Sequence, residues 1–201
     1  MLKEVNIVLA EDTRKTSILL KHYQIENKLQ SFHQHNEHKI TEGLIAKLKE
    51  GGQMALVSDA GTPGISDPGF MLVRACLQHD LKVETLPGAT AFIPALINSG
   101  LPCDRFVFEG FLPHKKGRNK RLEALKDESR TMIFYESPHR LIKMLHQLIE
   151  FMGPDRLASV SRELTKIHEE TQNGSLAALL ELFLSRKDIK GEIVIVVAGV
   201  K

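Results

Sequence analysis

Five short clusters of charged and small polar residues each follow an apolar run in this sequence of 201 residues. Carboxylates in such clusters can accept protons or bind hydroxyl and ammonium groups, and cationic side chains can bind phosphates. Each cluster alone is typical of a helix cap, but five clusters rich in Arg, Asp and Glu together indicate a binding site. They cover residues 11–14, 58–62, 88–90, 135–140 and 162–166.

The second cluster lies in the stretch 54–70, MALVSDAGTPGISDPGF. Its apolar start predicts a strand, and Gly61 and Gly64 permit the positive φ and close backbone approach that a ligand loop requires. Asp59 adds a negative charge. Parallel α/β proteins bind ligands beyond the carboxyl ends of their strands, where this loop would lie. A plain strand-to-helix turn explains the spacing equally well.

Alternating apolar runs and helical patterns in the first half predict a mainly parallel sheet with helices on both faces. The strands are expected at 6–10, 31–35, 54–57 and 82–86, and the helices at 13–23, 37–50, 67–79 and from 90 to Gly100. In the first helix Ile18, Leu19 and His22 share one side, and in the third Phe70, Val73 and Leu77 do. Asp67 and Pro68 are the expected N-cap and first residue of that third helix.

The second half predicts a second α/β domain with a mixed sheet. Its strands are expected at 106–111, 131–136, 158–162, 169–174 and 192–198, and its helices at 121–126, 140–152 and from Ser175. The last strand, EIVIVVA, is nearly all apolar, which is typical of a central strand buried on both faces. The segment 101–104 is the expected linker, so the domains are 1–102 and 103–201.

The amino-acid composition is typical of a globular protein without a disulfide framework. The chain is 42% hydrophobic and 26% charged, as in an ordinary globular protein, and no apolar run approaches the length that a bilayer requires. Cys76 and Cys103 form no disulfide framework, which fits a reducing cytoplasm. His33, His35 and His38 lack the spacing of a metal site on a helix face, so we expect no metal.

The segment 114–121, HKKGRNKR, concentrates positive charge, with five Lys or Arg among eight residues. Such a block can contact RNA phosphates. Composition alone nevertheless favours a solvated loop over such a contact.

Six segments in order resemble one family: SDAGTPGISDPGF, LPGATAFIPAL, SGLPCDRFVFEGFLP, TMIFYESPHRL, RELTKIHEE and KGEIVIVVAG. They are similar to the small-subunit ribosomal RNA 2′-O-methyltransferases of the tetrapyrrole methylase superfamily, the class III methyltransferases that use S-adenosylmethionine. The resemblance runs from about Leu2 to Gly199. It implies two α/β/α domains with the cofactor in a cleft between them. It also implies methyl transfer to the ribose 2′-hydroxyl of a cytidine in the ribosomal decoding region.

The resemblance also implies roles for individual residues. The residues expected to bind the cofactor are Ser58, Asp59, Ala60, Gly61, Ala89, Thr90, Tyr135, Glu136, Glu163 and Leu164. Those expected to bind RNA phosphates are Arg14, Lys115, Lys116, Arg118, Lys120, Arg121, His139, Arg140 and Arg162. A ribose hydroxyl is a poor nucleophile near neutral pH, so a base or an electrostatic stabiliser should assist. The candidates are Glu11, Asp12, Glu163 and Lys166, and the sequence does not choose among them.

The family pattern includes a strand and a TPIGN-like loop before the region where this sequence starts, and often a small helical domain after its last strand. Because that loop contributes to the cofactor site, we expect this chain to bind the cofactor weakly. An exposed sheet edge and the family both favour a homodimer.

Two other functions remain open from the sequence. The first is methylation of a small tetrapyrrole-type molecule on the same fold, against which the basic block and RELTK argue. The second is ribosome binding without catalysis, which the absent strand would explain.

Overall fold

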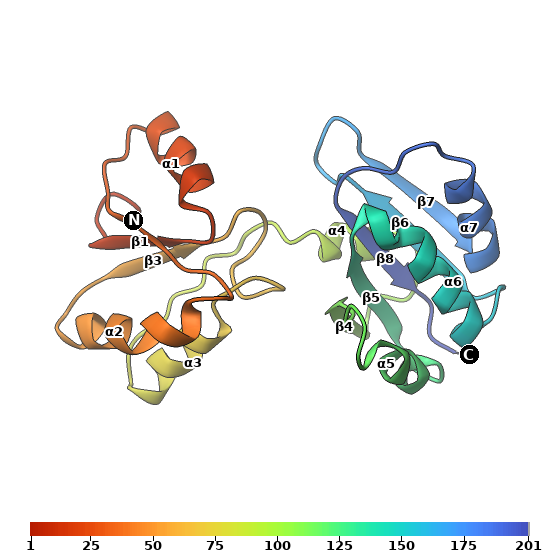
Figure 1. Cartoon of the computed structure of the whole chain (residues 1–201), viewed down its shortest axis with the longest axis horizontal. Helices are drawn as coiled ribbons and strands as arrows, with labels where there is room; N and C mark the ends of the chain where they lie inside the picture. The colour runs from red at the N-terminus through yellow and green to blue at the C-terminus, as the bar shows by residue number, and fades with distance from the viewer. Residues whose placement is uncertain (201) are drawn as a thin grey trace. The chain divides into compact units, whose positions relative to one another are not determined.

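The computed structural model describes residues 1–200, and the chain forms two compact units that divide between Ala89 and Thr90 (Figure 1). The sequence placed this boundary after residue 102. The difference is helix α4 (Phe92–Asn98), whose Ala95 and Leu96 are buried against the sheet of the second unit. The helix therefore belongs to the second unit because its apolar side covers that sheet.

The first unit contains a three-stranded parallel sheet of order β2-β1-β3. Helix α1 lies on one face, and α2 and α3 lie on the other (Figure 1). Leu9, Phe32, Leu44 and Leu72 form the core of this unit. The elements are β1 (Ile7–Ala10), α1 (Thr13–His22), β2 (Leu29–Ser31), α2 (Glu37–Lys49), β3 (Met54–Val57) and α3 (Phe70–Gln78).

Four expectations for this unit are corrected. The second strand ends at Ser31, before most of the range expected for it. Segment 82–86 is not a strand, because no strand among the described residues pairs with it. Helix α3 begins at Phe70 rather than Asp67, because Gly69 has a φ of 144°, which a helix cannot include.

The fourth correction concerns which sides of the helices are buried. In α1 the expected side, Ile18, Leu19 and His22, is exposed, and Thr16 and Leu20 are buried instead. In α3 the residues Phe70, Val73 and Leu77 are likewise exposed, whereas Leu72 and Cys76 face the core.

The second unit contains a five-stranded mixed sheet of order β4-β5-β8-β6-β7, in which β8 is central as predicted. The strands are β4 (Phe106–Phe111), β5 (Thr131–Glu136), β6 (Leu157–Arg162), β7 (Glu170–Ser175) and β8 (Ile193–Val197). The helices that cover it besides α4 are α5 (Arg118–Leu125), η1 (Pro138–Arg140), α6 (Leu141–Met152) and α7 (Leu176–Leu184).

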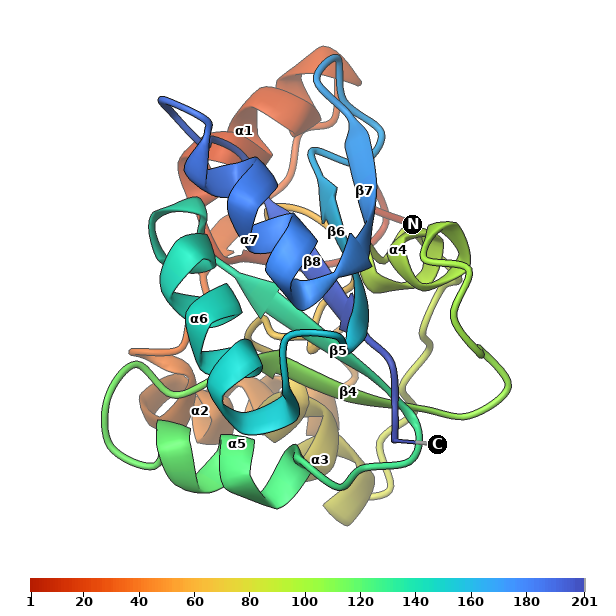
Figure 2. The same cartoon turned by 90° about the vertical axis from the view of Figure 1, so that its right-hand side faces the viewer.

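Alternating side chains of the second sheet separate two apolar layers. Figure 2 shows α5, α6 and α7 on one face of this sheet and α4 on the other. Met132 and Phe134 pack in the layer with α5, α6 and α7, whereas Ile133 and Val194 pack in the layer with α4. The period of two residues in β5 and β8 explains this division. The unit therefore has three layers, helix, sheet and helix, as the sequence predicted. No helix within residues 1–200 combines the length and apolar composition that a membrane span requires.

Candidate functional site

In the first unit, two of the predicted clusters meet at one edge of the sheet. Strands β1 and β3 are parallel neighbours, and Ala10 pairs with Val57, so the residues that follow both strands lie together. The backbone N–H of Asp12 donates to Oδ1 of Asp59 at 3.2 Å. Nζ of Lys15 lies 2.8 Å from Oδ2 of Asp59. Asp59 thus connects the two loops that the sequence selected.

Asp12 is the N-cap of α1. Its carboxylate accepts from the backbone N–H of Arg14 at 2.9 Å and forms an ion pair with the guanidinium of the same residue at 2.8 Å. The side-chain and backbone hydrogen bonds from Arg14 lower the pKa of Asp12 to about 2. Asp12 is therefore a poor proton acceptor at neutral pH.

The loop after β3 is closed by its own hydrogen bonds. The hydroxyl of Ser58 reaches the carbonyls of Ala60 at 3.1 Å and Gly61 at 3.3 Å, and Gly61 has a φ of 75°. The hydroxyl of Thr62 donates to the carbonyl of Ala89 at 3.2 Å. Within this unit the structure therefore brings together Ser58, Asp59, Ala60, Gly61 and Ala89. Thr90 begins the second unit, two residues before α4.

In the second unit, the other clusters gather at a single rim of the sheet. Strands β4, β5 and β6 run in the same direction, because β5 and β6 are each antiparallel to β8. Phe111, Glu136 and Arg162 therefore end at this rim, where β8 also starts. Tyr135 lies one residue before the rim and packs edge-on against Phe108 and Phe111.

Glu136 lies in the interior of the second unit, which corrects two predicted roles. One of its oxygens lies 2.9 Å from Arg118 and the other 2.6 Å from Arg140, and the backbone N–H of Ser137 also donates to it. The side chain of Arg118 is 4% exposed and also contacts Gln147 at 2.7 Å. Glu136 is thus committed to two arginines, and Arg118 cannot reach RNA from this position.

The cluster 162–166 forms a strained loop around Glu163. Glu163 and Thr165 have φ values of 52° and 66°, which are uncommon for residues with a side chain. Oε1 of Glu163 accepts from Nζ of Lys166 and from the backbone N–H of Glu192, both at 2.9 Å. Gly191 has a φ of 94°, and a Cβ there would lie 2.3 Å from Cγ of Glu163.

These contacts set the charges in the loop. The hydrogen bond from the Glu192 backbone, followed by that from Lys166, lowers the pKa of Glu163. The hydrogen bond to Glu163 raises the pKa of Lys166, and Glu192 at 3.1 Å adds to this effect. At neutral pH Lys166 is therefore a cation held by two carboxylates, and Glu163 is a weak base. Leu164 packs against the apolar layer on the α4 side of the sheet.

The other residues that were predicted to bind RNA differ in whether they already form hydrogen bonds within the protein. Lys115, Lys116, Lys120 and His139 are exposed. Arg121 forms two hydrogen bonds with Glu109, at 2.6 and 2.5 Å. Nη1 of Arg140 lies 2.7 Å from Nδ1 of His114. Arg162 bonds to Glu170 at 2.7 Å and to the carbonyl of Lys190 at 3.1 Å.

The sequence did not select Lys15 or Glu192, which are both partners of site carboxylates. Lys15 directly follows the first cluster, so its position was a usable signal. Glu192 meets Glu163 only through the pairing of β8 with β6, which no local pattern reveals.

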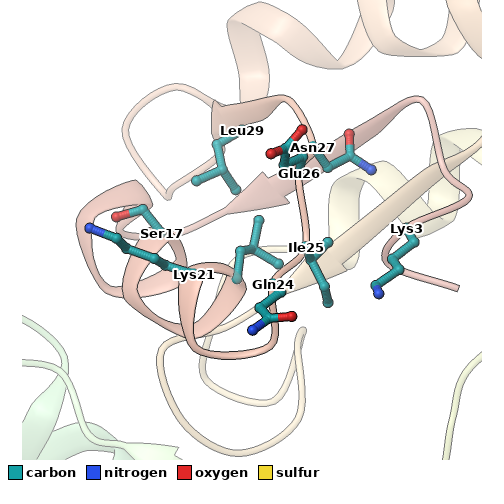
Figure 3. Close-up of a pocket in the computed structure, with 9 residues that line it drawn as sticks. Lys3, Ser17, Lys21, Gln24, Ile25, Glu26, Asn27 and Leu29 are labelled. Carbon is teal, nitrogen blue, oxygen red and sulfur yellow. The ribbon is translucent and has the colours of Figure 1, made fainter.

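A cavity of about 830 Å³ lies elsewhere in the first unit, between α1 and the segment that leads to β2 (Figure 3). Ser17, Lys21, Gln24 and Asn27 are among the residues that line it. Asn27 donates to the carbonyls of Leu2 and Val5, both at 2.8 Å, and so secures the N-terminal turn. None of the predicted site residues lines this cavity, so it is distinct from the candidate site.

Residues 1–180 match the family described as Tetrapyrrole (Corrin/Porphyrin) Methylases. The chain is 51% identical to ribosomal RNA small subunit methyltransferase I of Synechocystis sp., over 98% of this chain and 71% of that protein. Its identity to the protein of the same name from Escherichia coli O157:H7 is 47%, over 100% of this chain and 71% of that protein. For the Thermotoga maritima protein the identity is 43%, over 98% and 88% of the two chains.

Solved structures share the fold at much lower identity. The methyltransferase CobJ has a TM-score of 0.63 and 19% identity, over 96% of this chain and 93% of that chain. Uroporphyrin-III C-methyltransferase from Thermus thermophilus, complexed with S-adenosyl homocysteine, has a TM-score of 0.61 and 18% identity, over 97% and 86% of the two chains. These likenesses establish the tetrapyrrole methylase fold.

Proposed function

The chain belongs to the ribosomal RNA small subunit methyltransferase I family of the tetrapyrrole methylases, and from this membership we propose its reaction. It transfers a methyl group from S-adenosylmethionine to the ribose 2′-hydroxyl of a cytidine in small-subunit ribosomal RNA. The observation that carries the proposal is identity of 43–51% to proteins of that name over nearly the whole chain. The solved structures that share the fold are only 15–20% identical, so they support the fold and not the substrate.

Polar groups of the first unit suit the ammonium and the ribose hydroxyls of S-adenosylmethionine. Asp59 offers carboxylate oxygens that can accept from an ammonium or from ribose hydroxyls. Its partner Lys15 is 65% exposed, so it can move aside when a ligand donor takes its place. The glycine-containing turn 58–61, tied by Thr62 to Ala89, presents backbone groups without large side chains. We assign cofactor contacts to Ser58, Asp59, Ala60, Gly61 and Ala89.

The second unit offers a different set of groups. Tyr135 and Leu164 present partly buried apolar surface that suits the flat purine. We assign cofactor contacts to Thr90, Tyr135, Glu163 and Leu164. Glu136 is removed from this set, because Arg118 and Arg140 already occupy both of its oxygens.

The cofactor supplies a methyl group on a positively charged sulfur, which is already a strong electrophile. The protein must align the 2′-oxygen with the methyl group and remove the proton of the 2′-hydroxyl. Asp12 and Glu163 are weak bases because their pKa values are lowered. Glu11 has no hydrogen bond or ion pair to another of residues 1–200, so we assign it the role of general base. Lys166 is assigned the stabilisation of negative charge that develops on the oxygen.

RNA binding is assigned to the exposed Lys and His side chains of the second unit. Lys115, Lys116, Lys120 and His139 can contact phosphates without breaking an existing ion pair. Arg121, Arg140 and Arg162 keep guanidinium donors beyond the bonds they make, because each guanidinium has five. Arg14 joins them from the first unit, where its side chain is 89% exposed. Arg118 is excluded by its burial.

We further propose that the protein acts in the cytoplasm, as its RNA substrate implies, and that it forms a homodimer. Strand β3 is an edge of the three-stranded sheet, and no strand within residues 1–200 pairs with its outer side, which is consistent with association. Light scattering at micromolar concentration should give twice the mass of one chain, and a monomer there would contradict the dimer.

The reaction is tested with labelled S-adenosylmethionine and three acceptors: unmodified small ribosomal subunits, large subunits and a uroporphyrinogen. We expect label in small subunits only. Label in the uroporphyrinogen instead would support the small-molecule alternative. Small-subunit binding without any transfer would support a non-catalytic ribosome-binding protein.

A further inference from the structure

Lys15 lies in the first turn of helix α1 and holds the carboxylate of Asp59. Its Nζ is 2.8 Å from Oδ2 of Asp59, and its side chain is 65% exposed. The hydrogen bond to Asp59 raises the pKa of Lys15, and the negative charges of Asp12 and Glu11 add to this effect. Lys15 is therefore a cation at neutral pH, bound to a carboxylate that we assign to the cofactor.

The two oxygens of Asp59 are held by groups of different kinds. Oδ1 accepts from the backbone N–H of Asp12 at 3.2 Å, and this donor is fixed because Asp12 is the N-cap of α1. Oδ2 accepts from Nζ of Lys15, which ends a flexible and largely exposed side chain. Asp59 can therefore keep its orientation through Oδ1 when Lys15 leaves Oδ2.

The group that Asp59 binds in this structure has the same chemistry as one end of the cofactor. Nζ of Lys15 is a primary ammonium, and the methionine part of S-adenosylmethionine also carries a primary ammonium. The ribose hydroxyls of the cofactor are neutral, and they form weaker hydrogen bonds to a carboxylate than an ammonium does. Lys15 therefore competes with the ammonium of the cofactor for Asp59. An ion pair with so exposed a lysine is weak enough to be exchanged.

A second partner for Lys15 is close in the chain. Arg14 precedes it in the same helical turn, has a side chain that is 89% exposed, and is assigned to RNA phosphates. A lysine is a mobile point charge, so Lys15 can contact a phosphate beside that of Arg14 once it has left Asp59. While its ammonium is bonded to Asp59, Lys15 is not available to a phosphate.

We infer that Lys15 is a further substrate-binding residue, which leaves Asp59 when the ammonium of the cofactor binds there and then contacts a phosphate of the RNA. Each ligand takes one partner of the ion pair and releases the other, so the two ligands increase each other's affinity by the same factor. The inference rests on the proposed function, because it assumes both ligands, and it adds a coupling between them.

The affinity for the cofactor product tests the first half of the exchange. Lys15→Met removes the competing ammonium, so it should bind S-adenosyl homocysteine about twofold to fivefold more tightly than the wild-type chain. 5′-Methylthioadenosine has the ribose and the purine but no ammonium, so it should bind both chains equally. Lys15→Arg restores a cation and should return the affinity for S-adenosyl homocysteine to the wild-type value. Calorimetry measures all of these affinities.

The salt dependence of RNA affinity tests the second half. Saturating S-adenosyl homocysteine should steepen the plot of log affinity against log salt for small-subunit ribosomal RNA by about 0.7–0.9, which corresponds to one more phosphate contact. Lys15→Met should have the same slope with and without S-adenosyl homocysteine. The matched control is Lys82→Met, which removes an exposed lysine paired with Glu84 in the same unit and should show the wild-type steepening. Filter binding measures the slopes.

Three results would overturn the inference. The first is an affinity of Lys15→Met for S-adenosyl homocysteine equal to or below that of the wild type; a lower one would mean that Lys15 itself holds the cofactor. The second is an equal gain in affinity for 5′-methylthioadenosine, which would mean that Lys15 competes with ribose instead. The third is the same steepening in Lys15→Met as in the wild type. A wild-type chain that bound neither S-adenosyl homocysteine nor this RNA would instead contradict the proposed function itself.

Discussion

Nη2 of Arg118 lies 2.9 Å from Oε2 of Glu136, and both side chains are almost wholly inside the second unit. Glu136 ends β5, and Arg118 begins α5 in the middle of the basic segment. Arg140 approaches the other oxygen of Glu136 at 2.6 Å and continues to His114. This buried cluster fixes both ends of the segment 114–118 to the rim of the sheet, so it orders the loop whose lysines face solvent.

Glu136→Gln should lower the free energy of unfolding by about 3 kcal/mol, because it leaves two guanidiniums without their buried carboxylate. The control is Glu123→Gln, whose partner Lys126 and own side chain are both about half exposed, and which should change stability by less than about 1 kcal/mol. Urea denaturation measures both. Equal effects of the two substitutions would contradict the structural role of Glu136.

Gly191→Ala should destabilise the loop that holds Glu163, because the new Cβ would lie 2.3 Å from Cγ of that residue. Gly153→Ala is the matched control: its φ of 88° is similar, but no atom of the described residues lies within 4 Å of the added Cβ. The control measures the backbone penalty alone, about 1–3 kcal/mol. Gly191→Ala should lose more stability than this and should also weaken cofactor binding in calorimetry. If the two variants had the same stability and the same cofactor affinity, the side chain of Glu163 would be free to move away from the new Cβ.

Asp59→Ala should reduce cofactor affinity at least about tenfold, because a charged hydrogen bond contributes roughly 1.5–3 kcal/mol. Glu84→Ala is the control, since it removes an exposed carboxylate paired with Lys82 in the same unit. Calorimetry with S-adenosyl homocysteine measures both affinities. If Asp59→Ala and Glu84→Ala bind equally well, the assignment of Asp59 fails.

Acid should destabilise the β6–β7 edge through Glu170. Hydrogen bonds from Arg186 and Arg162 lower the pKa of Glu170 to about 2 from its ordinary 4.5. Because the folded-state pKa is lowered, this contribution is fully present above about pH 4.5 and is lost as the pH falls towards 2. Glu170→Gln should therefore flatten the decline in stability over that window. The free energy of unfolding is measured by urea denaturation at each pH. If it fell equally with pH in the variant and the wild type, Glu170 would not cause the loss of stability in acid.

The sequence predicted correctly those helices and strands that are determined by their local pattern of apolar residues. Helix α6 was recognisable from the spacing of Leu141, Leu145 and Leu148, and all three are buried. Strand β8 was recognisable as an apolar run, and it is buried throughout. The cluster 11–14 does cap a helix, through Asp12, and the helix expected from Ser175 is capped by the side chain of that residue.

The features that the sequence missed depend on partners that are distant in the chain. In α1 the position of the sheet decides that Leu20 is buried and Ile18 is not. The segment 82–86 has a strand-like composition, but no strand within residues 1–200 pairs with it. Arg118 and Lys116 belong to one basic run, yet only Arg118 faces Glu136, because α5 packs one side against α6. Composition cannot distinguish a buried arginine from an exposed lysine in such a run.

The central claim is methyl transfer to a ribose 2′-oxygen, and alkaline hydrolysis tests it most directly. Small subunits that lack the modification are incubated with the chain and methyl-labelled S-adenosylmethionine, and their RNA is then hydrolysed in alkali. A methylated 2′-oxygen cannot attack the neighbouring phosphate, so the label should remain in an alkali-resistant dinucleotide that begins with cytidine. Label recovered in mononucleotides would place the methyl group on a base, and the absence of label in RNA would mean that this chain does not catalyse the reaction.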